Sequence, residues 1–163
     1  MKQLLIVYHS MTGAARQLAS AACEGARDET SVQTTLLNAP DADADAVLGA
    51  DGYLFATPEN LASMAGLMKD FFDRIYYAAL DRINGRPYAA LIAAGTDGTG
   101  AERQIQRIAT GLRLREVAPA LIVVNGAQTP AAILAPKRVP PADLERAREL
   151  GAALAAGLAS GIF

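Results

Sequence analysis

The 163-residue sequence is poor in several features on which whole classes of protein depend. Its one cysteine, Cys23, allows no internal disulfide and no cysteine-based metal cluster, and such low usage is typical of a reducing compartment. The formal net charge of −2 offers no basic surface for nucleic acid. No apolar run reaches the ~18 residues that a membrane-spanning helix needs. These shortages favour a cytoplasmic protein with no nucleic-acid partner and no membrane span.

The sequence also lacks the motifs of several catalytic classes. The Gly-Lys-Ser/Thr of a P-loop does not follow Gly13, no G-x-G-x-x-G follows the first apolar run, and no G-x-S-x-G supports a hydrolase. Glu29 stands where a Cys-x5-Arg phosphatase that used Cys23 would need its arginine. His9-Ser10 and Thr57-Pro58 stand where a receiver domain would need its acids. We therefore name no catalytic side chain and no metal ligand.

What the sequence does contain is a regular alternation of apolar runs and helical patterns. The runs are continuously apolar, which is typical of strands in a parallel sheet covered on both faces. Right-handed crossovers leave few topologies, and five such strands fit the order 2-1-3-4-5. We predict an α/β fold with a doubly wound five-stranded parallel sheet, in a single domain over residues 1–163. The expected strands are the run from Leu4 to Tyr8, Ser31–Leu37, Tyr53–Ala56, Tyr88–Ala94 and Val117–Val124, the last with an edge or bulge near Pro119.

Apolar residues at helical spacing predict the helices between these strands. Asp41 is expected to cap the second, short helix, and the acids near its start are explained by the helix dipole rather than by a metal. Asn125–Val139 is expected to be irregular, and Tyr76 and Tyr77 to follow the third helix. The expected helices are Gly13–Arg27, a short one from Asp41 to Leu48, one carrying Met64 to Ile75, one carrying Ile105 to Leu112, and a last one that opens at Pro140-Pro141.

Loops rich in small or polar residues follow the first, third and fourth strands. They cover His9–Ala15, Thr57–Ser63 and Gly95–Gly100. The carboxyl ends of these strands meet at one edge of a doubly wound sheet, where such folds bind their ligands. The first loop leads into a helix whose free N–H groups and dipole attract a phosphate. The sequence therefore predicts one crevice for a flat ligand that carries a phosphate.

These loops resemble those of the flavodoxin-like FMN-binding proteins and the NAD(P)H-dependent FMN/quinone reductases. Ser10–Ala15 is similar to their phosphate loop, Ser/Thr-x-Thr-Gly-x-Thr, with Ala15 in place of the last threonine. Thr57–Asn60 is similar to their Thr/Ser-Pro turn beside the isoalloxazine, Lys69–Arg74 to their Lys-x-Phe-x-Asp-Arg helix, and Ala94–Gly100 to their third flavin loop. The resemblance implies a three-layer flavodoxin-like sandwich that binds FMN.

The resemblance also implies which residues contact the cofactor, mostly through backbone N–H groups. Two of them have a structural interpretation as well, Pro58 as a turn former and Asp97 as the side chain of an Asx-turn with Gly98. The implied FMN-binding residues are Ser10, Met11, Thr12, Gly13, Ala14, Ala15, Thr57, Pro58, Glu59, Asn60, Leu61, Ala62, Gly95, Thr96, Asp97 and Gly98.

The activity that the resemblance implies depends on the lack of aromatic residues in the loops. Electron-carrier flavodoxins usually hold the flavin between aromatic side chains, but this chain has no tryptophan, and its second and third loops have no tyrosine or phenylalanine. One flavin face would stay open to NADH or NADPH and then to a quinone-like or other small acceptor, which favours an oxidoreductase. The alternative is an electron-transfer protein that serves a redox partner protein. Related reductases often form homodimers, but no stripe in this sequence marks an interface.

Three residues keep two interpretations each. His9 lies at the end of the first strand, either beside the phosphate or flavin or simply packed there. Arg103 and Arg107 are one helical turn apart, so they either bind an NADPH phosphate or form a solvated helix face.

Overall fold

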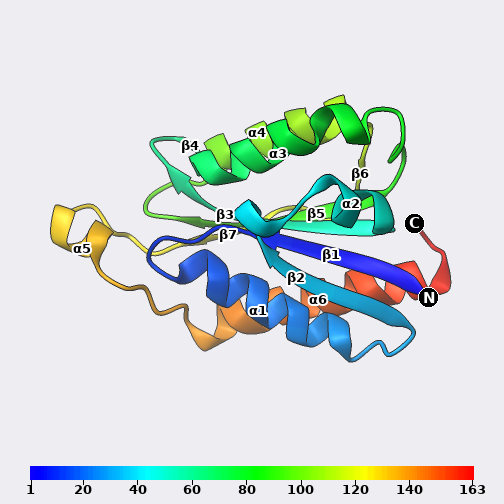
Figure 1. The fold of residues 1–163 in the computed structure, drawn as a ribbon. Helices are drawn as coiled ribbons and strands as arrows, with labels where there is room; N and C mark the ends of the chain where they lie inside the picture. The colour runs from blue at the N-terminus through cyan, green and yellow to red at the C-terminus, as the bar shows by residue number, and fades with distance from the viewer.

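A computed structural model describes residues 1–163 as one sheet between two layers of helices (Figure 1). The parallel strands follow the order β2-β1-β3-β5-β6, and β7 also pairs in parallel with β5. The predicted doubly wound order is therefore confirmed. The strands are β1 (Lys2–Tyr8), β2 (Val32–Asn38), β3 (Gly52–Asn60), β4 (Ser63–Met64), β5 (Pro87–Ala94), β6 (Arg115–Glu116) and β7 (Leu121–Val124).

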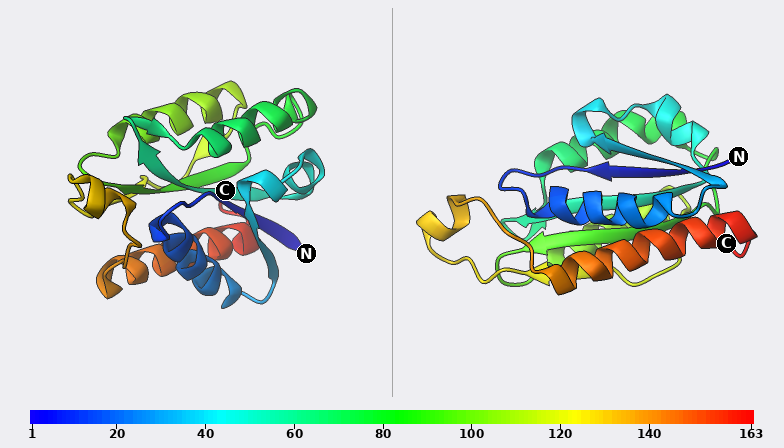
Figure 2. Two further views of the ribbon diagram at one scale, coloured as in Figure 1. Left: turned by 60° about the vertical axis from the view of Figure 1, so that its left-hand side comes forward. Right: turned by 90° about the horizontal axis from the view of Figure 1, so that it is seen from below.

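The two faces of the sheet carry separate hydrophobic cores because side chains alternate along a strand. In β1, Leu4 and Ile6 belong to one core and Leu5 and Val7 to the other. Helices α1 and α6 cover the first face, and α2, α3 and α4 cover the second, as Figures 1 and 2 show. The helices are α1 (Ala14–Arg27), α2 (Ala44–Gly49), α3 (Gly66–Ala79), α4 (Thr99–Gly111), α5 (Pro130–Leu134) and α6 (Pro141–Ser160), with a 3-10 turn at Ala39–Asp41.

The predicted fifth strand, Val117–Val124, is correct only in its second half, Leu121–Val124, which is β7. The short strand β6 lies before Val117, and Pro119 lies between β6 and β7. Proline has no N–H to donate to the ladder, so the interruption falls where the sequence predicted an edge or a bulge.

The predicted second loop is also partly wrong. Strand β3 continues to Asn60, and Glu59 and Asn60 pair in antiparallel fashion with Met64 and Ser63 of β4. Met64 therefore lies in a hairpin, and α3 begins only at Gly66.

The helices need three further corrections. Asp43 rather than Asp41 caps α2, because its side chain accepts a hydrogen bond from the N–H of Ala46 at 2.8 Å. Tyr76 and Tyr77 lie inside α3 rather than after it. The segment expected to be irregular contains the short helix α5, whose N-cap is Thr129.

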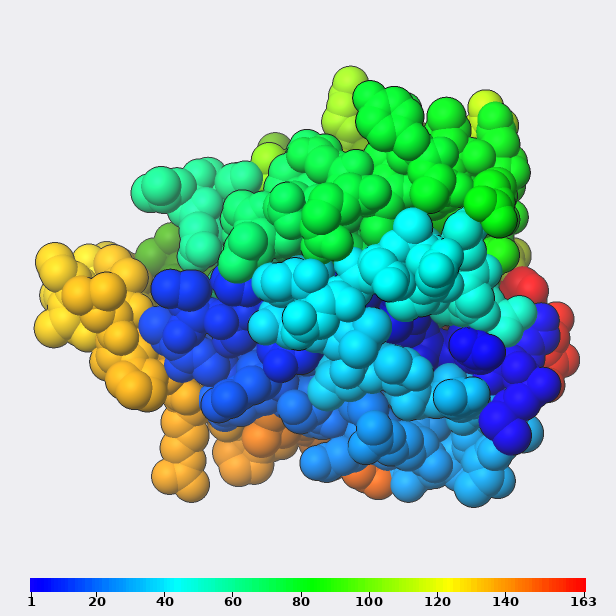
Figure 3. Space-filling view, viewed as in Figure 1, coloured from blue at the N-terminus to red at the C-terminus, as the bar shows by residue number.

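The carboxyl ends of β1, β3, β5 and β7 lie at one end of the molecule, and both chain termini lie at the other (Figure 1). At the first end, the loop after β1, the β3–β4 hairpin and α5 come together on the surface (Figure 3). None of the helices combines the length and the apolar composition that crossing a lipid bilayer requires.

Candidate flavin site

A cavity of about 620 Å³ opens at this end of the sheet. The three loops singled out in the sequence form much of its wall, so the structure brings together segments that are far apart in the chain. The lining residues are Ser10, Met11, Thr12, Ala14 and Ala15 from the first loop, Pro58, Glu59, Asn60, Leu61 and Ala62 from the second, Ala93, Ala94, Gly95 and Thr96 from the third, and Asn125, Ala127, Ile133, Leu134 and Lys137 from a fourth segment.

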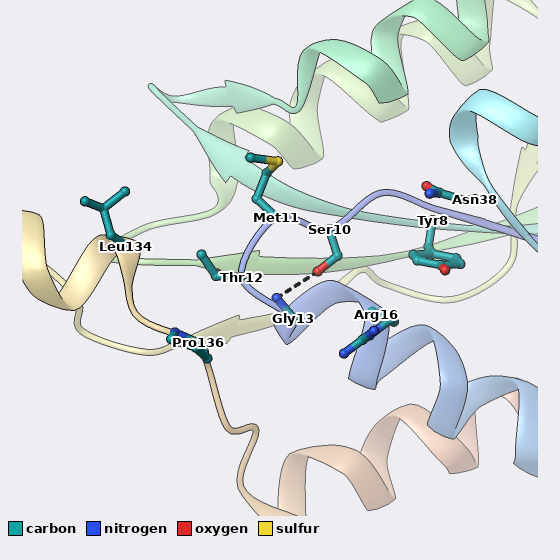
Figure 4. A pocket seen from close by; sticks show the side chains of 9 residues that line it. All are labelled: Tyr8, Ser10, Met11, Thr12, Gly13, Arg16, Asn38, Leu134 and Pro136. Carbon is teal, nitrogen blue, oxygen red and sulfur yellow. Dashed lines mark hydrogen bonds between the residues drawn. The ribbon is translucent and has the colours of Figure 1, made fainter.

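The first loop forms a cradle of free hydrogen-bond donors. Gly13 is the N-cap of α1 at a φ of 101°, and its N–H donates to Ser10 Oγ at 3.1 Å (Figure 4). The N–H groups of Ala14, Ala15 and Arg16 have no acceptor within the chain. The first turn of α1 has no acidic residue and its N-cap has no side chain, so the positive end of the helix dipole is unopposed. This arrangement suits a phosphate.

The second loop is a tight hairpin under backbone strain. Only Leu61 and Ala62 join β3 to β4, and both have positive φ values, 51° and 61°. Turns of this kind favour Asn-Gly, because most side chains disfavour the left-handed region. The side chain of Leu61 is fully exposed at the rim of the cavity.

Glu59 joins the second loop to the third. One of its carboxylate oxygens accepts the N–H of Gly98 at 2.9 Å, and the other accepts the N–H of Ala101 at 3.0 Å. The acid therefore caps α4 from a distant strand, and the helix dipole stabilises its negative charge. Glu59 lines the cavity with both of its oxygens already bonded.

Two glycines allow these segments to approach one another. A Cβ at Gly100 would overlap the carbonyl oxygen of Ala62, so the hairpin packs directly on the first turn of α4. Gly98 has a φ of 96°, and a Cβ there would overlap the side chain of Ile122 in β7. The glycine-rich third loop is thus explained by close packing as well as by any ligand.

Four of the predicted site residues lie outside this cavity. The hydroxyl of fully buried Thr57 accepts the N–H of Ala65 at 3.1 Å, which fixes the start of α3. Asp97 accepts the N–H of Thr99, as an Asx-turn does, and the N–H of Gly98 is bonded to Glu59. Gly13 lines a smaller neighbouring cavity.

The wall contributed by the fourth segment was missed in the sequence. The N–H of Lys137 donates to the carbonyl of Thr12 at 2.7 Å, which ties the segment to the first loop. Gln17 of α1 donates to the carbonyls of Gly13 and Lys137 and accepts the N–H of Val139. The available signal was positional, because the segment follows the carboxyl end of the fifth predicted strand, at the same edge of the sheet.

The structure shows where the three residues lie for which the sequence allowed two interpretations. His9 is buried and does not line the cavity, and burial lowers the pKa of its imidazole. Arg103 and Arg107 are exposed on α4, form no salt bridge and also lie outside the lining.

The residues present fit FMN. The donors of the first loop match a phosphate, and the cavity volume is within the ~300–1,000 Å³ usual for small-molecule sites. The small side chains of Ala93, Ala94 and Thr96 leave room for a flat ring against the third loop. No aromatic residue lines the cavity, which agrees with the composition of the loops.

Comparisons with known proteins agree with this geometry. Residues 39–128 match the family model described as NADPH-dependent FMN reductase. A flavodoxin of Aquifex aeolicus (strain VF5) is 30% identical over 112 residues, which cover 69% of this chain and 60% of that protein. An NAD(P)H dehydrogenase (quinone) of Acidithiobacillus ferrooxidans is 27% identical over 133 residues, covering 69% of this chain and 66% of that protein. The chain thus spans less than two thirds of the length of either curated relative.

The match to the family model covers more than half of the chain. Among solved structures, a flavodoxin from the domain Archaea superposes with a TM-score of 0.78 at 18% identity, over 96% of this chain and 99% of that one. The structural likeness shows a flavodoxin-like fold, and the chain belongs to the NADPH-dependent FMN reductase family.

Proposed function

We propose that this protein is an FMN-dependent oxidoreductase that passes electrons from NADH or NADPH to a quinone-like or other small acceptor. The observation that carries the proposal is the cavity of about 620 Å³ whose wall joins a phosphate cradle to a wide, non-aromatic slot. The family to which the chain belongs, and the quinone dehydrogenase among its relatives, support the same reaction.

Bound FMN supplies the redox chemistry, so the chain needs no acid, base or nucleophile of its own. The N–H groups of Ala14 and Ala15 hold the phosphate, and the hydroxyls of Ser10 and Thr12 add to them. The turn at Pro58–Ala62 and the loop at Gly95–Thr96 border the ring. Glu59 ties the turn to the residues that follow Gly95–Thr96, because its carboxylate accepts the N–H groups of Gly98 and Ala101.

The absence of an aromatic wall favours an enzyme over an electron carrier. An aromatic side chain stacked on the ring would occupy the face that a second flat reactant needs. Here the large hydrophobic side chains exposed at the rim are not aromatic, and they are Met11, Leu61, Ile133 and Leu134. They leave room for nicotinamide and for an acceptor to reach the ring in turn.

The test is made on the purified chain, first without added cofactor and then with FMN. We expect a yellow protein, or micromolar FMN uptake followed by quenching of flavin fluorescence. We also expect NADH or NADPH oxidation that accelerates when benzoquinone is added. Tight FMN binding without NAD(P)H oxidation would favour the alternative, an electron-transfer protein for a redox partner, which the similarity to a flavodoxin also supports. A colourless protein that takes up no FMN would exclude both.

A further inference from the structure

Four large hydrophobic residues that line the candidate flavin cavity are exposed to solvent. They are Met11 of the first loop, Leu61 of the β3–β4 hairpin, and Ile133 and Leu134 of α5. The exposed fraction ranges from 51% for Ile133 to 101% for Leu61, although residues of this kind are usually buried. Figure 4 shows the side chains of Met11 and Leu134 extending on the side of the phosphate loop that faces the hairpin. We call these four residues the apolar rim.

The position of the apolar rim relates it to the ligands of the cavity. Its residues come from three segments of the chain that meet at this end of the molecule (Figure 3), and all four also line the cavity. Exposed apolar surface that gathers in one place marks a site of contact. A reactant that enters the cavity from solvent passes the rim, so any part of it that stays outside lies against these side chains.

The cavity offers no charged group that is free to bind a charged reactant. Its only charged lining residues are Glu59 and Lys137, and both oxygens of Glu59 already accept backbone N–H groups. The ammonium of Lys137 donates to the carbonyls of Ala132, Ile133 and Ala135, which uses its three N–H groups. A charged acceptor would lose hydration here and gain no ion pair in return.

We propose that the apolar rim binds an aliphatic side chain of the electron acceptor, so the preferred acceptor is an uncharged quinone that carries such a chain. The inference rests on the proposed function, which places the quinone ring in the cavity. The ring enters the cavity and the chain lies across the rim. The hydride of NADH or NADPH and one proton from water convert the quinone to its hydroquinone and leave NAD(P)⁺. The aliphatic chain takes no part in this reaction and contributes only to binding.

The test uses the FMN-loaded protein and a series of quinones that differ only in one substituent. Duroquinone is compared with analogues in which one methyl group is replaced by a propyl chain, a pentyl chain, or a pentyl chain that ends in a carboxylate. Titration calorimetry without NAD(P)H measures binding, and initial rates with NAD(P)H measure kcat/KM. We expect the pentyl analogue to exceed duroquinone about tenfold in both quantities, because partial burial of each added CH2 group favours binding. The terminal carboxylate should remove most of this gain.

Variants of α5 show whether the rim causes the preference. Ile133→Gln and Leu134→Gln, alone and together, remove apolar surface at exposed positions of the rim. Leu80→Gln is the matched control, because Leu80 is also exposed but lies at the end of α3 away from the hairpin and does not line the cavity. We expect the ratio of pentyl analogue to duroquinone to fall about threefold or more in the double variant and to stay unchanged in the control.

The proposal is overturned if the pentyl chain gives no gain, if the carboxylate analogue gains as much, or if the α5 variants keep the preference. A second copy of the chain is the other candidate to cover the rim. A dimer in sedimentation that the α5 variants dissociate would assign the rim to an interface between copies and would also overturn the proposal. A protein that binds FMN but reduces none of the quinones would instead contradict the proposed function, and calorimetry of the same series, which needs no NAD(P)H, would still decide the role of the rim.

Discussion

The carboxylate of Glu59 accepts the N–H of Gly98 at 2.9 Å, across 39 positions of the chain. Gly98 is the N-cap of α4 and has no side chain with which to cap its own helix. The acid that does so comes from β3, and it also bonds Ala101 one turn further on. One side chain thus sets the distance between the second and third walls of the cavity.

Replacing this acid should harm both stability and ligand binding. In Glu59→Gln one oxygen remains, but an amide NH2 faces a helix N–H, so we expect a loss of about 1–2 kcal/mol in the free energy of unfolding. FMN affinity should fall as well, because the two walls lose their link. Glu102→Gln, which removes the same charge from the first turn of α4 without breaking a hydrogen bond, is the control. Equal urea midpoints for the two variants would contradict the capping role.

The contact between Gly100 and Ala62 predicts opposite effects for two glycine substitutions in one helix. In Gly100→Ala the new methyl group meets a backbone oxygen of the hairpin, so we expect a loss of about 1–3 kcal/mol and weaker FMN binding. In Gly111→Ala, at the open end of α4, nothing lies within 4 Å, and the better helix former should stabilise by up to about 1 kcal/mol. Thermal unfolding of both variants measures the difference, and two losses of similar size would argue against close packing at the hairpin.

Because the hairpin is strained, we expect replacement of alanine by glycine to stabilise the chain there and to destabilise it inside a helix. Ala62→Gly should stabilise the chain by about 1 kcal/mol, since glycine adopts positive φ without the cost that alanine bears. Ala153→Gly, at an exposed position inside α6, should destabilise by about 1 kcal/mol because glycine is a poor helix former. Denaturant unfolding of the pair provides the measurement. Destabilisation by Ala62→Gly would mean that the left-handed turn is not strained.

The buried imidazole of His9 predicts a pH dependence of stability. Burial lowers its pKa in the folded state from an ordinary value of 6.5, so below about pH 6.5 the unfolded chain takes up the proton first. The free energy of unfolding should therefore have its full value above this pH and decline as the pH falls towards the pKa of His9 in the folded state. His9 is the only histidine, and the lowered pKa values of the Glu29 and Asp51 carboxyls act in a more acidic range. Urea unfolding between pH 5 and 7 should show a slope that His9→Gln removes; an unchanged slope would contradict the assignment.

Much of this architecture was predictable because it depends on local patterns. The continuous apolar runs around Ile6, Leu54 and Leu91 indicate buried parallel strands, and the observed strand order agrees with them. The first loop was predictable because Ser10, Thr12 and Gly13 lie between an apolar run typical of a strand and a helical pattern.

The features that were missed depend on contacts between distant segments. Leu61-Ala62 is a poor turn signal, so a hairpin held by packing on Gly100 was interpreted as a loop. The wall at Ile133–Lys137 is held by Gln17, more than a hundred residues earlier, and nothing in its own proline-rich sequence indicates that bond. No pattern in the sequence around Glu59 indicates that its side chain caps a helix that begins at Thr99.

The sequence by itself determined the parallel sheet, the main helices and the edge of the sheet at which three loops meet, because hydrophobic periodicity and glycine-rich turns act over a few neighbouring residues. Only the tertiary structure decided which side chains enclose the cavity, which are used to hold its walls, and that the exposed residues of the apolar rim all line it. Such contacts join residues that the fold brings together, and their energies do not appear in any local pattern.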